Sequence, residues 1–159
     1  VFDVEAYKIA NPALNVVYDV APYKNTGLYN KKYLPRKGQT SGQPELNYDN
    51  NQRIIRYADV LLMAAEANVT SNPAKAQSYL DRVRDRAFGN TSHRVTATKQ
   101  AIWDERRLEL AMEGDRFFDL VRTGQAAAKI TGFIVGKNEI FPIPQREIDI
   151  SGLTQNPNW

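Results

Sequence analysis

The sequence RIIRYADVLLMAAEANV, residues 53–69, decides the fold class. Its apolar residues recur at the spacing i, i+4, i+7 and i+11, at Ile54, Ala58, Leu61 and Ala65. Ile55 and Leu62 widen this stripe, and Asn50 or Asn51 can cap the start. Because this period is that of one face of an α-helix, the stretch predicts a half-buried amphipathic helix.

A second helix of about 16 residues is predicted directly after it. Asn72 is a capping residue, and Pro73 occupies the first helical position that proline favours. The same apolar spacing follows at Ala76, Leu80, Val83 and Ala87. Gly89 stands where a helix end favours a left-handed residue. The connection is short, so we expect the two helices to pack as an antiparallel hairpin.

Residues 96–128 predict further helices. Thr96 or Thr98 can cap a third helix that runs to about Glu113 and ends at Gly114. Its expected apolar face consists of Ala101, Leu108, Ala111 and Met112, flanked by Trp103 and Leu110. A short helical turn is expected at residues 116–121, and another helix around residues 126–128. These elements predict an all-α fold.

Proline and tyrosine divide the chain into three segments of one domain. Residues 1–50 hold six of the eight tyrosines and read as an irregular, loop-rich lead with one short hairpin. Residues 51–129 hold a single proline and form the helical core. Residues 130–159 begin with a β-favouring run at 133–135 and continue with Pro142 and Pro144, which predict an extended, Pro-rich C-terminal arm.

Composition narrows the function classes. The 159 residues carry 21 basic and 18 acidic side chains, a net charge of +3, and no cysteine. The length suits one domain, and no apolar run is long enough to cross a bilayer. The absence of cysteine excludes disulfides and thiolate chemistry within these residues. The chain opens at Val1 with neither a methionine nor a signal pattern, so we expect it to be part of a longer protein.

The densest polar cluster follows Asp104. Glu105 and Glu109 lie one helical turn apart, as a pair of carboxylates for glycosidic acid-base chemistry would. The alternative is a structural network of salt bridges, to which we assign Glu105, Arg106, Arg107, Glu109, Arg116 and Asp119. So many neighbouring guanidinium groups would lower the pKa of both glutamates, which is wrong for a general acid near neutral pH. We therefore favour the structural interpretation.

Other chemistries find little support. Ten arginines lie between residues 53 and 122, but residues 51–129 balance 13 basic against 10 acidic side chains. A nucleic-acid interface needs clustered, unopposed positive charge, so none is expected. His93 is the only histidine and stands in a polar loop. No metal-ligand spacing and no glycine-rich phosphate loop occurs, so we expect neither a metal nor a cofactor.

The tyrosines of the lead segment are the remaining candidates for binding. Tyr23, Tyr29 and Tyr33, with Arg36 close by, have the composition of a sugar platform. Aromatic rings stack on pyranose faces while planar polar side chains donate hydrogen bonds. Loop tyrosines more often anchor an irregular segment to a core by their rings. We keep these four as ligand-binding candidates, and Tyr29 and Tyr33 qualify only if their rings are exposed.

Four motifs in order resemble the SusD/RagB family of outer-membrane glycan-binding lipoproteins. They are RYADVLLMAAEA at residues 56–67, LDRVRDRA at 80–87, DERRLELAMEGDRFFDLVRTG at 104–124, and the C-terminal pair FPIPQREID at 141–149 and LTQNPNW at 153–159. Ala64, Phe117 and the final Asn158 and Trp159 depart from the usual Tyr, Trp and Gly-Tyr. None of these departures touches a known chemical role.

The resemblance implies a longer protein of tetratricopeptide-like helix pairs, of which this chain is the C-terminal third. Such a protein is held on the outward-facing surface of the outer membrane by an N-terminal lipidated cysteine, which is absent from this chain. It captures oligosaccharides for a SusC-like TonB-dependent transporter and is not an enzyme. In described relatives the sugar platform lies mostly upstream of these motifs, so the motifs are expected to be scaffold. The alternative is a helical-repeat protein-interaction module without carbohydrate binding.

Overall fold

The computed structural model describes residues 2–18, 26–33, 51 and 53–159. Contacts divide the chain into two compact units, Val1–Arg56 and Tyr57–Trp159. Tyr23 and Arg36, two of the ligand-binding candidates, lie outside the described residues.

The first unit joins two short strands that lie far apart in the sequence. Strand β1 (Phe2–Asp3) pairs antiparallel with β2 (Leu28–Tyr29), with Phe2 opposite Tyr29. Between them lie helix α1 (Val4–Ala10) and the 3-10 helix η1 (Pro12–Leu14). Helix α1 lies in a segment that was expected to be irregular. Asp3 caps it by accepting a hydrogen bond from the Ala6 amide at 3.0 Å.

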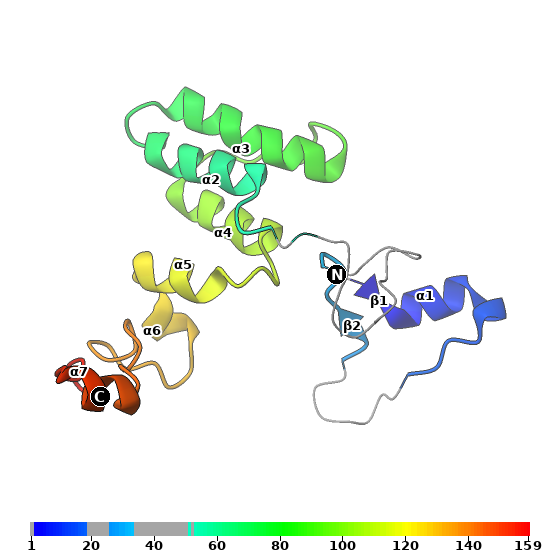
Figure 1. The fold of residues 1–159 in the computed structure, drawn as a ribbon. Coiled ribbons are helices and arrows are strands. Elements are labelled where there is room, and N and C mark those ends of the chain that lie inside the picture. Colours follow the sequence, from blue (N-terminus) through cyan, green and yellow to red (C-terminus); the bar gives the residue numbers. More distant parts are fainter. Residues whose placement is uncertain (1, 19–25, 34–50, 52) are drawn as a thin grey trace. The chain divides into compact units, whose positions relative to one another are not determined.

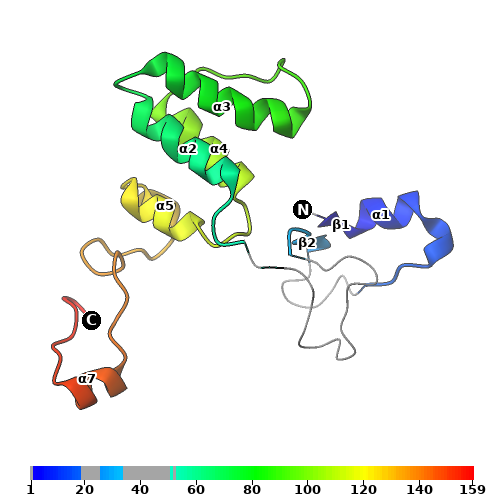
Figure 2. The same cartoon turned by 45° about the horizontal axis from the view of Figure 1, so that its top comes forward.

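The second unit is built on a helical hairpin. Helices α2 (Tyr57–Asn68) and α3 (Pro73–Phe88) lie side by side in Figures 1 and 2, and the short connection makes them antiparallel. Helix α4 (Lys99–Glu109) packs against α2. The core between the three helices is apolar and closed, with its most buried large side chains at Leu62, Leu80, Val83 and Ile102.

Helix α3 follows the predicted bounds because local signals define both of its ends. Asn72 accepts a hydrogen bond from the Lys75 amide at 3.2 Å, and Pro73 is the first helical residue. Gly89 ends the helix with φ of 70°, a left-handed conformation that a side chain would strain. Thr98 similarly caps α4 by accepting from the Ala101 amide at 3.1 Å.

The predicted start of α2 was wrong. The helix begins at Tyr57 instead of residue 53, so Ile54 and Ile55 lie before it and are 90% and 66% exposed. Packing, more than propensity, stabilises short helices in proteins. The contacts of α2 with the core begin at Ala58, and the earlier apolar positions therefore gain nothing from helical geometry.

The predicted face of α4 was also wrong. Leu108 is 68% exposed, and the helix ends at Glu109 instead of Glu113. The buried side instead carries Ile102, Glu105 and Arg106. Buried charges are tolerated only when they are paired. The ion-pair partners of Glu105 and Arg106 therefore determine which face of α4 is buried.

The chain continues through α5 (Arg116–Arg122), α6 (Ala126–Lys129) and α7 (Gln145–Ser151). The first two match the predicted turns. Residues 133–135 form no strand, and α7 interrupts the segment that was expected to be extended. Pro144 precedes α7, and Gly152 ends it at φ of 64°. The all-α fold class is confirmed. Among the described residues, no helix is both long and apolar enough to cross a membrane.

Candidate functional site

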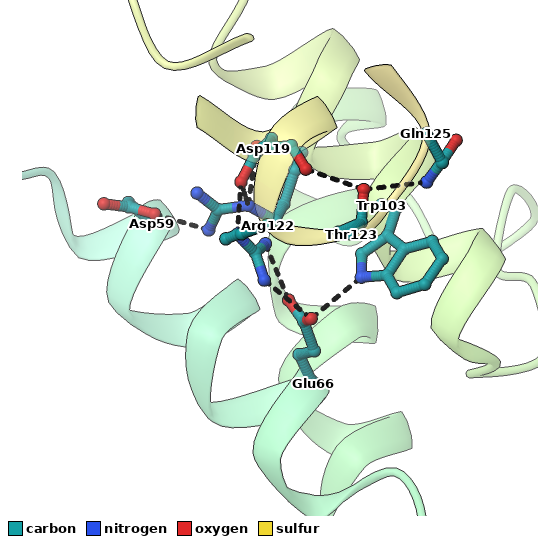
Figure 3. Close-up of polar contacts among 8 residues, drawn as sticks. Asp59, Glu66, Trp103, Asp119, Arg122, Thr123 and Gln125 are labelled. Atoms are coloured by element: carbon teal, nitrogen blue, oxygen red, sulfur yellow. Dashed lines mark hydrogen bonds and ion pairs between the residues drawn. The ribbon is translucent and has the colours of Figure 1, made fainter. Parts of the chain in front are cut away.

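The most closely organised polar group joins α2, α4 and α5 (Figure 3). At its centre is Arg106, whose residue surface is only 6% exposed. Its Nη1 donates to Oδ1 of Asp59 at 2.6 Å, and its Nε donates to Oδ2 of Asp119 at 3.0 Å. One guanidinium thus binds a carboxylate from each of the two neighbouring helices. We call Asp59, Glu66, Trp103, Arg106, Asp119 and Arg122 the polar clip.

Arg122 completes the polar clip from the end of α5. Its Nη1 and Nη2 donate to the two carboxylate oxygens of Glu66 at 2.8 and 2.9 Å, and its Nε donates to Asp119 Oδ1 at 2.8 Å. The indole of Trp103 donates to Glu66 Oε1 at 2.8 Å. Asp119 is therefore shared by two guanidinium groups, and both oxygens of Glu66 are engaged.

The end of α5 is fixed by two further contacts. The Thr123 hydroxyl donates to the Asp119 carbonyl at 2.6 Å, and Gln125 Nε2 donates to the Thr123 hydroxyl at 3.1 Å (Figure 3). These bonds satisfy polar groups at a helix end that would otherwise need water. They hold the backbone that carries Asp119 and Arg122.

The charges of the polar clip shift its pKa values in the direction expected for ion pairs. Burial alone would raise the pKa of Glu66, but hydrogen bonds from Arg122 and Trp103 outweigh burial and lower it. Burial opposes the charge of Arg106, yet its bonds to Asp119 and Asp59 raise its pKa. Glu66 and Asp119 raise the pKa of Arg122 as well. The lowered pKa of Glu66 is the opposite of what a general acid requires near neutral pH.

The two glutamates considered for glycosidic chemistry are each paired with an arginine of α3. Glu105 is 5% exposed and forms an ion pair with Arg84, and Glu109 binds Nη2 of Arg86 at 2.6 Å. These contacts tie α4 to α3. Arg107 and Arg116 are exposed and form no ion pair within the described ranges.

The network therefore contains partners that the sequence analysis missed, on α2 above all. Asp59 and Glu66 are seven residues apart, which places them on one face of that helix. They meet Arg106 and Arg122 there. Acidic residues at i and i+7 beside an apolar stripe were the available signal, but their arginine partners are 47 and 56 residues away in sequence.

The tyrosine candidates lie in the first unit. Tyr29 belongs to β2 and is 39% exposed. Tyr33 is half-buried, and its hydroxyl donates to the Arg53 carbonyl at 3.5 Å. The exposed ring of Tyr29 remains compatible with the predicted sugar contact, whereas Tyr33 is partly covered.

No metal or catalytic histidine site emerges from the described part of the chain. His93 stacks on Phe88 with ring centroids 4.2 Å apart. Within the residues that the structure describes, no three His, Cys, Asp or Glu side chains are grouped so that they could hold a metal ion. The contacts of the polar clip join α2, α4 and α5.

These observations define an all-α protein whose helices are joined by buried ion pairs, and sequence comparison identifies its family. Residues 5–159 match the SusD family, so the chain belongs to it. SusD-like protein P25 from Formosa agariphila is 41% identical over 88 residues, 51% of this chain and 17% of that protein. SusD-like protein P2 from the same organism is 34% identical over 125 residues, 71% of this chain and 23% of its own length.

Solved structures agree with this assignment. A laminarin binding SusD-like protein superimposes with a TM-score of 0.82 at 40% identity, covering 99% of this chain and 34% of that one. Surface glycan-binding protein A from Bacteroides thetaiotaomicron, in complex with laminarihexaose, superimposes with a TM-score of 0.75 at 35% identity. The superposition covers 96% of this chain and 35% of that one. The chain thus spans about a third of these solved relatives and about a fifth of the curated ones. Both solved relatives are named as glycan-binding proteins.

Proposed function

We propose that this chain is the C-terminal scaffold of a surface glycan-binding protein that captures oligosaccharides. The observation that carries the proposal is the match of nearly the whole chain, at 40% identity, to a laminarin binding SusD-like protein. The second glycan-binding relative was solved with laminarihexaose, which makes short β-glucans the first ligands to test. No turnover of the captured sugar is part of this function.

The contacts of the second unit suit a scaffold. The two α3–α4 ion pairs engage Glu105 and Glu109, the carboxylates considered for glycosidic chemistry, and the polar clip engages Asp59, Glu66 and Asp119. A network of this kind fixes the relative positions of α2, α3, α4 and α5. A rigid base of this type can present binding loops with little loss of conformational entropy on binding.

The proposal extends to location and partner through the family. The protein would sit on the outward face of the outer membrane, held by an N-terminal lipidated cysteine, and would pass its ligand to a SusC-like TonB-dependent transporter. This sequence itself contains no cysteine, so the anchor would lie outside it.

Two measurements test the proposal. Isothermal titration of the purified protein against laminarihexaose and a panel of other oligosaccharides should give binding to at least one of them. Affinity purification of the tagged protein from outer membranes should recover a TonB-dependent transporter in stoichiometric amount. Recovery of soluble protein partners with neither a transporter nor glycan binding would instead favour a helical-repeat interaction module.

A further inference from the structure

The second unit contains an open hollow of about 270 Å³ next to α5, which we call the aromatic hollow. Four aromatic side chains line it: Phe117, Phe133, Phe141 and Trp159. They come from α5, from the turns after α6, and from the C-terminal segment. Phe117, Phe141 and Trp159 belong to the sequence motifs that were expected to be scaffold, and the sequence assigned no ligand contact to them.

The rings are grouped around Phe117. Its centroid lies 5.6 Å from that of Phe141 and 6.5 Å from that of Phe133, both in tilted geometry. Such spacings are the favourable ones for aromatic pairs. Phe141 nevertheless remains 64% exposed and Trp159 43% exposed, so much of their surface stays open to solvent.

Hydrogen bonds to the backbone hold the Trp159 wall in place. The indole Nε1 of Trp159 donates to the carbonyls of Lys137 and Ile140 at 3.0 and 3.2 Å. Lys137 Nζ lies 4.6 Å from the centre of the same ring. Asn158 Nδ2 donates to the Gly136 carbonyl at 2.8 Å. These contacts preorganise the ring.

The Phe141 wall is fixed from the same C-terminal segment. Asn156 Nδ2 donates to the Phe141 carbonyl at 2.6 Å. The side chain of Gln155 forms two hydrogen bonds with the backbone of Ile143. Its Oε1 accepts from the Ile143 amide at 2.8 Å, and its Nε2 donates to the Ile143 carbonyl at 2.9 Å. Both walls are therefore part of one hydrogen-bonded structure, which reduces the entropy lost when a ligand binds.

Every residue that lines the aromatic hollow is uncharged. Thr131 and Asn138 supply the polar groups, and Asn138 uses its Oδ1 to accept from the Ile134 amide at 2.6 Å. Aromatic faces with a few hydroxyl and amide groups match a neutral sugar ring, which offers C–H groups on its faces and hydroxyls at its edges. Charged ligands would find no counter-charge among these lining residues.

We propose that the aromatic hollow is a sugar-binding subsite for one or two neutral pyranose units of an oligosaccharide. Its volume lies just below the range of pockets for drug-sized ligands, in agreement with so short a segment. The inference deepens the proposed glycan-binding function and rests on it. It gives this chain a direct contact with the ligand in addition to its role as scaffold.

The test uses Trp159 as a built-in reporter and Phe141 as the probe. The purified protein is titrated with laminarihexaose while tryptophan emission and binding heat are recorded. We expect the emission to change on binding. In Trp159→Phe, which alters one wall of the aromatic hollow, this emission change should disappear and the binding heat should report a weaker affinity. Phe141→Ala should weaken affinity by about tenfold, equivalent to about 1.4 kcal/mol.

Phe118→Ala is the matched control. Phe118 is 61% exposed, and its ring centroid lies 5.7 Å from that of Phe117, but Phe118 does not line the hollow. It should change affinity by less than twofold, and thermal unfolding identifies any variant that has lost its fold. Normal binding by Phe141→Ala, or binding without a change in Trp159 emission, overturns the subsite but leaves the proposed function standing. Failure of the unaltered protein to bind any oligosaccharide of the panel overturns both.

Discussion

Removal of the Arg106 charge is the sharpest perturbation of the scaffold. Arg106→Met keeps the length of the side chain but leaves Asp59 and Asp119 facing each other across a buried position. The side chains of Asp59 and Asp119 are 16% and 11% exposed, so neither remaining carboxylate is fully solvated. Removing one partner of a buried ion pair costs about 3 to 5 kcal/mol.

Asp119 keeps one partner in this variant, because Arg122 Nε still donates to its Oδ1 at 2.8 Å. We therefore expect a loss near the lower end, about 3 kcal/mol of unfolding free energy. At roughly 2 to 4 °C per kcal/mol for a chain of this size, the melting temperature should fall by about 6 to 12 °C.

The assay is equilibrium unfolding in urea, followed by circular dichroism, with thermal melts alongside. Arg107→Met is the control, since the neighbouring arginine is exposed and forms no ion pair within the described residues. Surface changes of this kind stay within about 0.5 kcal/mol. Equal stability of Arg106→Met and Arg107→Met would refute the view that the polar clip holds α2, α4 and α5 together.

Two further predictions concern the second unit. Because the pKa of Glu66 is lowered below its ordinary value of 4.5, its stabilisation is present above that pH and is lost as the pH falls through the folded-state pKa. Glu66→Gln should therefore cost about 1 to 3 kcal/mol at pH 7. Its difference in unfolding free energy from the unaltered protein should shrink as the pH falls through the folded-state pKa of Glu66, measured by urea unfolding over a series of pH values. A difference that stays constant as the pH falls would contradict the ion pair. Asn72→Ala should destabilise the protein by about 1 kcal/mol, because the α3 cap is lost. Ser71→Ala is the control and should leave the stability unchanged. Equal melting temperatures for the two variants would show that the Asn72 cap does not stabilise the protein.

The helices that carry local end signals are the ones that the sequence predicted well. For α3, Asn72, Pro73 and Gly89 define both ends without help from the rest of the protein. Helix α1 lacked an apolar stripe long enough to stand out, and its cap at Asp3 was not recognised. Helix α7 follows two prolines that indicated an extended chain, although proline before a helix is compatible with its start.

The candidate site was only partly predictable because its partners meet through tertiary structure. Apolar spacing in α4 suggested that Leu108 faces inward, yet the ion pairs of Glu105 and Arg106 turn the charged side to the core. Hydropathy treats a charged residue as exposed unless its partner is known. The aromatic hollow was missed for a similar reason, since Phe117 and Trp159 are distant in sequence and come together only in the fold.

The central claim is that this chain belongs to a protein that binds glycans without altering them. The most direct measurement is isothermal titration of laminarihexaose into the purified protein, followed by chromatography of the recovered sugar. The account predicts saturable binding and recovery of the intact oligosaccharide. Shortened products would contradict the non-catalytic role, and absence of binding to laminarihexaose and to every other glycan of the panel would contradict the proposed function.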